Sequence, residues 1–288
     1  MQTNTLKWFY LTVLALIWGS SFILIKKGLL GLNPYQLGAL RIIFTAVFVL
    51  IIGFKSLTEI RLHQWKYIAI TSLFGTFLPV FLFPLSETKV SSSICSILNS
   101  LTPLSTLIIG TLGFGLVIKR NQAFGVIIGL IGTLILIFTG DNSGETENYF
   151  YTIFAIIASV CYAVNVNLIK KYLSDVKPLS ITTGNFVVLL IPAIIILLST
   201  DFQTNMYLPA TQDAMIYIII LGVVGTGVAN IIFFKLIQTS SPVFATSVTY
   251  LIPIIAFFWG LLDNEILTPT QGVGAFIILV GVYLSSKK

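Results

Sequence analysis

Polar side chains within long apolar runs are the residues of this sequence most able to do chemistry. The strongest candidate is Arg41, which follows Pro34 by seven residues and so lies roughly 10 Å along a helix that begins there. A planar guanidinium can hold a carboxylate through two parallel hydrogen bonds. Three uses of Arg41 are open: snorkelling towards a polar boundary, an interior ion pair or carbonyl clamp, and direct contact with a bound solute.

Amide side chains in apolar runs form the second group of candidates. Asn165 and Asn167 lie in the middle of one run, and Asn185 matches Arg41 in a later part of the chain. A buried amide has to find a hydrogen-bond partner or a wet cavity. These residues therefore either line a cavity or bond neighbouring helices together, and for the aromatic candidates the alternatives are a cavity wall and ordinary packing. The candidates for the cavity lining are Trp18, Ser21, Arg41, Asn99, Tyr162, Asn165, Asn167, Asn185, Asn230, Thr249 and Tyr250.

The amino-acid composition predicts that these polar groups lie in largely apolar surroundings. Apolar residues make up 56% of the 288 residues and charged residues 9%, against about 25% charged in an ordinary soluble domain. Such a chain cannot cover a surface that faces water, so we expect an integral membrane protein. The formal net charge of +6 does not indicate nucleic-acid binding, because runs such as 127–139 leave no basic face.

Ten apolar runs are long enough to cross a bilayer core about 30 Å thick as helices. Helices are the expected element because strand-like alternation is absent, and backbone groups in lipid have to pair within their own segment. The first run ends in Lys26 and Lys27 without a cleavage-site pattern, so we expect a retained span rather than a signal peptide. The predicted spans are residues 8–27, 34–54, 66–86, 91–115, 121–140, 149–170, 178–199, 212–237, 242–262 and 269–286.

The chain contains an internal repeat. Residues 18–34 match residues 162–178 at a shift of 144. Gly-Thr pairs at 75–76 and 225–226 match at a shift of 150. Because the shift is about half the chain length, each half is expected to be one copy of a single structural unit.

The repeat divides the chain into a first five-helix repeat (1–140), a polar linker (141–148) and a second five-helix repeat (149–288). Because five is an odd number, the second repeat has to enter the membrane from the side opposite to the first. The sequence therefore predicts an all-α membrane protein made of two inverted five-helix repeats. Secondary transporters frequently use this plan, because two similar halves can rock about a site near the membrane midplane.

Two prolines interrupt runs that are rich in Ser and Thr. A proline inside a helix lacks a backbone donor and frees the carbonyl about four residues earlier, which belongs to Asn99 for Pro103 and to Thr249 for Pro253. Helix breaks at matching positions of two repeats point to a binding site near the midplane. The alternative is that nearby hydroxyl groups bond the freed carbonyls.

Lys and Arg residues near the ends of the spans predict the orientation in the membrane. If the N-terminus is cytoplasmic, eleven of these cations are cytoplasmic and three are external, so we expect both termini of this multi-pass protein to be cytoplasmic. Glu87 and Lys235 lie near predicted helix ends, where we expect them to reach water. The external cations are Lys26, Lys27 and Lys89, and the cytoplasmic ones are Lys7, Lys55, Arg61, Lys66, Lys119, Arg120, Lys170, Lys171, Lys177, Lys287 and Lys288.

The sequence lacks motifs for several other chemistries. Its Gly-rich segments do not end in the Gly-Lys-Ser/Thr of a phosphate loop, and no His or Cys pair has the spacing of metal ligands. Cys95 and Cys161 lie in apolar runs, where we expect them to pack as small hydrophobic residues, and His63 lies in a polar loop. We therefore expect no cofactor, no metal ion and no enzymatic activity, and the sequence leaves the oligomeric state open.

Four short motifs are shared with a known family. They are WGSSF at 18–22, ALR at 39–41, the Ser-rich stretch that ends in LTP at 101–103, and EILTPTQGVG at 265–274. Together they resemble the drug/metabolite transporter superfamily, and most closely its ten-helix EamA-type permeases, over essentially the whole chain. One departure from the family pattern is that Glu265 has no acidic counterpart in the first half.

The resemblance implies a bundle in which helices 1 to 4 and 6 to 9 enclose a central substrate cavity, with helices 5 and 10 outside it. It also implies transport of metabolites, commonly the export of amino acids or related small molecules. With the inverted repeat, it favours a secondary transporter that works by alternating access. The rival hypotheses are an integral membrane enzyme and a non-transporting membrane scaffold. The glycines expected to bring helices 5 and 10 close to their neighbours are Gly125, Gly129, Gly132, Gly274 and Gly281.

Overall fold

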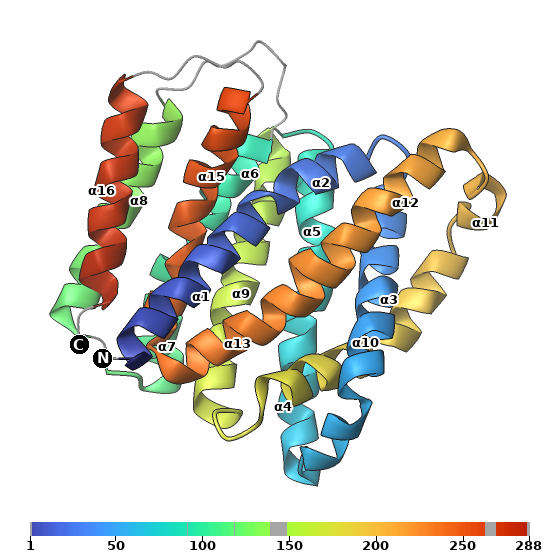
Figure 1. Cartoon of the computed structure of the whole chain (residues 1–288), viewed down its shortest axis with the longest axis horizontal. Coiled ribbons are helices and arrows are strands. Elements are labelled where there is room, and N and C mark those ends of the chain that lie inside the picture. Colours follow the sequence, from blue (N-terminus) through green and yellow to red (C-terminus); the bar gives the residue numbers. More distant parts are fainter. Residues whose placement is uncertain (1, 91, 118, 139–148, 263–268, 287–288) are drawn as a thin grey trace.

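The computed structural model describes residues 2–90, 92–117, 119–138, 149–262 and 269–286. Over these ranges all regular secondary structure is helical, as the sequence predicted, and the helices form one bundle (Figure 1). The predicted linker 141–148, the acidic residue Glu265 and the terminal Lys287 and Lys288 lie outside the described residues.

The helices follow one another in two similar series. Between residues 2 and 138 the helices are α1 (Gln2–Gly19), α2 (Ser21–Gly28), α3 (Pro34–Gly53), α4 (Trp65–Ser72), α5 (Leu78–Glu87), α6 (Ser92–Asn99), α7 (Thr102–Phe114) and α8 (Arg120–Phe138). Between residues 149 and 286 they are α9 (Thr152–Tyr172), α10 (Pro178–Leu198), α11 (Phe202–Asn205), α12 (Pro209–Gly222), α13 (Ala229–Thr239), α14 (Pro242–Thr246), α15 (Val248–Leu262) and α16 (Pro269–Ser286). Short 3₁₀ turns occupy Phe54–Glu59, Leu62–Gln64 and Tyr149–Tyr151.

Six helical segments in the described ranges are long and apolar enough to cross a membrane. They are Thr5–Gly28, Pro34–Glu59, Leu62–Glu87, Thr152–Tyr172, Pro178–Leu198 and Pro209–Thr239. Shorter apolar helices cover Thr102–Phe114, Pro242–Ile255 and Phe276–Ser285. These segments make the chain a multi-pass membrane protein, and the count of ten crossings stays a prediction.

The start of α3 shows how local sequence fixes the helix that carries Arg41. The Asn33 side-chain oxygen accepts hydrogen bonds from the backbone N–H groups of Tyr35 at 3.0 Å and Gln36 at 2.9 Å. The Gln36 side chain in turn accepts from the Asn33 backbone N–H at 3.0 Å, which completes a capping box. Pro34 occupies the first turn, where its missing N–H removes no helical hydrogen bond.

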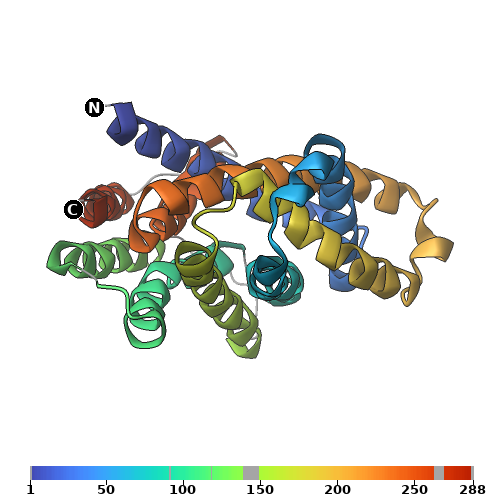
Figure 2. The ribbon, with the colours of Figure 1, turned by 90° about the horizontal axis from the view of Figure 1, so that it is seen from below.

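Helices α8 and α16 lie side by side at one end of the long axis, and α11 lies at the other end (Figure 1 and Figure 2). Glycines bring their backbones close together. A Cβ atom at Gly281 would lie 2.5 Å from the Gly129 nitrogen, and one at Gly132 would lie 2.7 Å from the Ile278 nitrogen. These glycines therefore serve helix packing, as the sequence predicted.

Candidate functional site

A cavity opens among the helices of the two series. The space between its walls is about 820 Å³, including the part that is open to the surroundings. None of the described side chains of α8 or α16 lines it, which agrees with the expectation that these two helices lie outside the cavity. Eight of the eleven candidate residues line it: Trp18, Ser21, Arg41, Asn99, Tyr162, Asn165, Asn230 and Thr249.

Two of the candidate amides lie outside the cavity lining and are bonded inside the protein. The Asn167 amide nitrogen donates to the Thr106 carbonyl at 3.1 Å, which links α9 to α7. The Asn185 side-chain oxygen accepts from the Thr71 hydroxyl at 3.1 Å, which links α10 to α4. For both residues the structure therefore shows the interhelical hydrogen bond that was the alternative to a cavity role.

Tyr250 also lies outside the cavity lining. Its side chain is fully buried, and its hydroxyl donates to the Val126 carbonyl at 2.9 Å. The ring fills the space beside Gly129, where a Cβ atom would lie 2.6 Å from a ring carbon. Tyr250 thus joins α15 to α8, and its role in this structure is packing.

Arg41 keeps its head group inside the bundle. Only 7% of the residue is exposed, and its Nε donates to the Thr226 hydroxyl at 2.7 Å. No carboxylate oxygen of the described residues lies within 4.0 Å of its guanidinium. The Thr45 hydroxyl links α3 to α12, because its single proton is shared between the Arg41 carbonyl at 2.7 Å and the Gly222 carbonyl at 2.8 Å. The wall of the cavity thus contains a buried guanidinium that interacts with the Glu87 carboxyl only at a distance and forms no ion pair within the described ranges.

Each series contains one π-helical turn in its cavity wall. The turns cover Leu73–Phe77, between α4 and α5, and Val223–Val228, between α12 and α13. The Gly-Thr pairs at 75–76 and 225–226 lie within them and line the cavity. A π-helical turn adds a residue to a helix and is frequently found at functional sites. The sequence showed the two pairs as marks of the repeat, yet they were missed as candidates for the site.

The glycines in these turns allow other cavity residues to approach the backbone. The Trp18 ring nitrogen donates to the Gly225 carbonyl at 3.0 Å. A Cβ atom at Gly75 would overlap the Asn165 amide group. Small residues at these two positions are therefore required by the walls of the cavity.

Two oxygen atoms of the lining have no hydrogen-bond partner within the described part of the chain. They are the Thr76 hydroxyl oxygen and the Asn165 amide oxygen. A buried polar atom without a partner is destabilising unless water or a ligand bonds it. The cavity thus offers a cation and unsatisfied acceptors, a set that suits a solute with both a carboxylate and hydrogen-bond donors.

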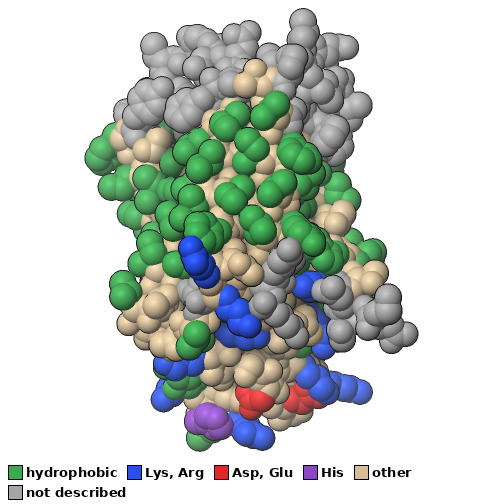
Figure 3. Space-filling model, turned by 90° about the vertical axis from the view of Figure 1, so that its left-hand side faces the viewer, with side chains coloured by type: hydrophobic (Ala, Val, Ile, Leu, Met, Phe, Trp, Pro, Cys, Tyr) green, Lys and Arg blue, Asp and Glu red, His purple; other side chains and the backbone are tan. Residues whose placement is uncertain are grey.

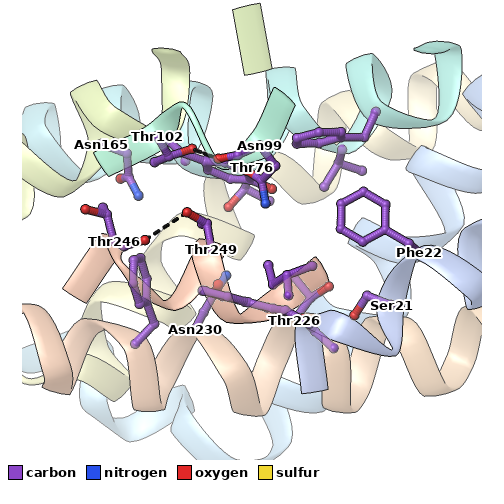
Figure 4. A pocket seen from close by; sticks show the side chains of 18 of the residues that line it. Ser21, Phe22, Thr76, Asn99, Thr102, Asn165, Thr226, Asn230, Thr246 and Thr249 are labelled. Atoms are coloured by element: carbon purple, nitrogen blue, oxygen red, sulfur yellow. Dashed lines mark hydrogen bonds between the residues drawn. The ribbon is translucent and has the colours of Figure 1, made fainter. Parts of the chain in front are cut away.

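The helix breaks lie close to the positions that the prolines predicted. In the first series α6 ends at Asn99, and the Thr102 hydroxyl donates to the Asn99 carbonyl at 2.7 Å (Figure 4). In the second series the break falls between α14 and α15, whereas Pro253 lies inside α15. The Thr249 carbonyl accepts from the Ser100 hydroxyl at 3.1 Å. Hydroxyl groups therefore do bond the freed carbonyls, and some of the same residues also line the cavity.

Aromatic rings form a further part of the cavity wall. Trp18 meets Phe233 edge to face, with ring centroids 4.9 Å apart, and Phe22 meets Phe83 in the same way at 5.8 Å. Phe83 also stacks on Tyr162 at 5.9 Å. Trp18 and Tyr162 thus pack against other rings and line the cavity at once.

The two charged residues expected to reach water differ from each other. Lys235 is exposed, as predicted. Glu87 is half-buried: one carboxylate oxygen accepts from the Ser92 hydroxyl at 2.8 Å, and the other is buried without a partner among the described residues. Across the same part of the chain, no group of three His, Cys, Asp or Glu residues could hold a metal ion.

Comparisons with known proteins assign the chain to a family. The model of the EamA-like transporter family matches twice, at residues 6–138 and 150–287. The "Uncharacterized inner membrane transporter YedA" of Escherichia coli (strain K12) is 25% identical, over 95% of this chain and 88% of that protein. The "Probable amino-acid metabolite efflux pump" of Salmonella typhimurium (strain LT2) is 22% identical, over 96% of this chain and 93% of that protein.

The same fold is found among solved structures. One of them is described as "Crystal structure of protein", and it superposes with a TM-score of 0.75 at 14% identity, over 96% of this chain and 95% of that one. At that identity the likeness concerns the fold alone. The resemblance read from the sequence motifs is confirmed by the family match, which covers most of the chain. The chain belongs to the EamA-like transporter family.

Proposed function

We propose that this transporter exports small metabolites, such as amino acids or related compounds, across the cytoplasmic membrane by alternating access. The proposal depends chiefly on one observation. A membrane-spanning bundle encloses a cavity whose wall holds the Arg41 guanidinium, and no carboxylate oxygen of the described residues lies within 4.0 Å of it. A buried cation of this kind favours an anionic group on the solute that enters.

The acceptor groups of the cavity narrow the substrate class within this proposal. The Thr76 and Asn165 oxygens favour a ligand that also carries an ammonium, hydroxyl or amide donor. The ring-lined part of the wall suits an apolar side chain on the same solute. A small amphipathic zwitterion meets all three requirements, and the name of the Salmonella relative agrees with a solute of this kind.

Two inverted repeats are part of the proposed mechanism. The cavity lining supports the presence of two repeats, because most of its residues in one half of the chain have a counterpart in the other half that also lines the cavity. Thr76 and Asn99 lie across the cavity from Thr226 and Thr249, their counterparts at the shift of 150 (Figure 4). The last turns of α2 and α9, which match at the shift of 144, lie at opposite ends of the bundle (Figure 1). We therefore keep the division into repeats 1–140 and 149–288.

The proposed orientation places both termini in the cytoplasm. Helix α1 begins and α16 ends at the same end of the bundle (Figure 1). On the face shown in Figure 3, Lys and Arg side chains gather towards that lower end, and hydrophobic side chains cover the region above them. This distribution supports a cytoplasmic location for the cation-rich end.

Solute flux in proteoliposomes tests the proposed function. Vesicles that contain the purified protein are expected to release preloaded zwitterionic solutes faster than protein-free vesicles, with rates that saturate as the solute concentration rises. Mono-carboxylates and amines without the second charge serve as the comparison panel. A non-transporting scaffold would give the same release as empty vesicles for every solute in the panel.

Two asparagines on one helix provide a matched pair of variants. Asn165→Ala removes an unpartnered acceptor from the cavity, so we expect a weaker apparent affinity for a zwitterionic solute, by about fivefold to tenfold, with little change in melting temperature. Asn167→Ala removes the bond to α7, so we expect a lower melting temperature and an unchanged apparent affinity. A lower affinity for Asn167→Ala together with an unchanged affinity for Asn165→Ala would show that the solute does not bind beside Asn165.

A further inference from the structure

A lysine fastens together the ends of two helices in the second series. The Lys170 ammonium, in the last turn of α9, donates to the carbonyls of Ile237 at 3.0 Å, Gln238 at 3.2 Å and Ser240 at 2.7 Å. These carbonyls lie at the C-terminal end of α13, where a cation also interacts favourably with the helix dipole. One side chain thus closes the gap between α9 and α13.

A second set of hydrogen bonds joins the same two helix ends, this time with the donor on α13. The Gln238 side chain donates to the carbonyls of Leu173 at 3.1 Å and Val176 at 2.6 Å, just beyond the end of α9. The two links run in opposite directions, so α9 and α13 are joined both by the lysine of one and by the glutamine of the other. This end of the second series is therefore closed by five hydrogen bonds.

At the matching end of the first series, the described residues form no such set of hydrogen bonds. Lys26 in α2 matches Lys170 at the shift of 144. Residues 87–90, at the end of α5 and just beyond it, match at the shift of 150 the segment whose carbonyl groups Lys170 binds. Lys26 is exposed, and within the described ranges it donates no hydrogen bond and forms no ion pair. Thr88, which matches Gln238, is also exposed and donates only to the Leu85 carbonyl of its own helix.

Acceptors for Lys26 are nevertheless present at the end of α5. Helix α2 contacts α5, and α5 ends at Glu87. One Glu87 oxygen is buried and has no partner among the described residues. Lys26 therefore lies close enough to Glu87 for an electrostatic attraction, but in the described ranges it forms no hydrogen bond or ion pair, and one Glu87 oxygen stays unfilled.

We propose that Lys26 and Lys170 are alternating latches. Lys170 holds α9 against the end of α13 in the conformation seen here, and in the opposite conformation Lys26 holds α2 against the end of α5, with Glu87 as an added acceptor. This inference rests on the proposed alternating access, because two inverted repeats exchange conformations when the transporter changes the side to which it opens.

Cysteine labelling from the two sides of the membrane tests the latches. The background replaces the buried Cys95 and Cys161 with alanine, and Ser21→Cys supplies a reporter in the cavity wall. A membrane-impermeant maleimide is added to intact cells or to inside-out vesicles. The quantity measured is the ratio of the labelling rate from the Lys26 side to that from the Lys170 side.

Removing each latch is expected to move this ratio in opposite directions. Lys170→Met removes three of the five hydrogen bonds at the ends of α9 and α13 and should lower the ratio about tenfold, because these three charge-assisted bonds are made in the present conformation. Lys26→Met removes a bond made only in the opposite conformation and should raise the ratio at least about threefold. Because Lys26 has no hydrogen bond to lose here, this variant tests the inference even if Lys170→Met folds poorly.

The adjacent lysines supply matched controls. Lys171 donates one bond to the Phe114 carbonyl at 3.1 Å, and Lys27 lies over the Tyr217 ring at 5.4 Å, so Lys171→Met and Lys27→Met should leave the ratio unchanged. Equal ratios for Lys26→Met and Lys27→Met, or for Lys170→Met and Lys171→Met, would overturn the latch assignment, as would shifts of both latch variants in one direction.

Flux of the same variants, without the reporter, separates this inference from the proposed function. Flux with no effect of the lysine changes on labelling would reject the latches and leave the transporter proposal intact. Opposite shifts in labelling without flux of any solute in the panel would support the latches and reject the proposed substrate class.

Discussion

Replacing Arg41 with alanine is expected to weaken the apparent affinity for carboxylated solutes about 30-fold, because a lost charge-assisted hydrogen bond costs about 2 kcal/mol. Arg41→Lys keeps the positive charge but cannot copy the planar fork of the guanidinium, so a loss of about tenfold is expected. Solutes without a carboxylate should lose much less. The measurement is saturable uptake into proteoliposomes, with the detergent melting temperature determined for each variant.

Arg61 provides the control for this prediction. It forms an exposed ion pair with Asp175 at 3.8 Å and does not line the cavity, so Arg61→Ala and Arg61→Lys should leave uptake unchanged. If Arg41 is only a structural clamp for Thr226, both Arg41 variants should lower the melting temperature before selectivity changes. Wild-type uptake by Arg41→Lys would remove Arg41 from the substrate-binding residues.

Replacing Gly281 with leucine is expected to separate α8 from α16 and to lower the melting temperature by about 5 °C or more. A Cβ atom at this position would lie 2.5 Å from the Gly129 nitrogen and 2.7 Å from its Cα, and these backbone atoms cannot move without shifting the helix. Forcing extra atoms into a packed interface typically costs about 1–3 kcal/mol, and occasionally more. The measurement is thermal unfolding in detergent, together with the yield of monodisperse protein.

Gly113 offers the matched control, because a Cβ atom there would meet no other atom within 4 Å. Gly113→Leu should therefore melt within about 2 °C of the unaltered protein, with only the helix-propensity difference between the two residues acting. Since the side chains that the structure describes on α8 and α16 do not line the cavity, Gly281→Leu protein that remains folded should keep its affinity for solute. Equal melting temperatures for the two variants would contradict close packing of α8 against α16.

The sequence predicted the helical segments well because length and hydropathy alone determine which runs can cross a membrane. It could not separate Asn165 from Asn167. The two lie on different sides of one helix, and both sides are buried among apolar neighbours, so no pattern of polarity distinguishes a cavity wall from a helix contact. Whether each asparagine lines the cavity or bonds a neighbouring helix depends on its contacts with other helices, and these contacts depend on the tertiary structure.

Helix irregularities were only partly predictable, for a physical reason. The helix break near Pro103 was predictable, because a proline cannot donate a helical hydrogen bond. The π-helical turns at Leu73–Phe77 and Val223–Val228 require one extra residue per turn, and no residue type enforces this. Glu87 was expected in water because it ends a helix, but packing against neighbouring segments buries one of its oxygens.

Accelerated exchange in proteoliposomes tests most directly the claim that the cavity carries a solute by alternating access. One set of vesicles is loaded with an unlabelled zwitterionic solute and a second set is left without it. The rate at which the labelled solute enters is then compared between the two sets. The account predicts that internal solute speeds entry at least about threefold, because the transporter changes the side to which it opens while it carries solute. In Arg41→Ala, loaded and unloaded vesicles should take up the labelled solute at the same rate when the solute concentration is unchanged. Entry that is independent of internal solute, and that rises linearly with concentration, would contradict it.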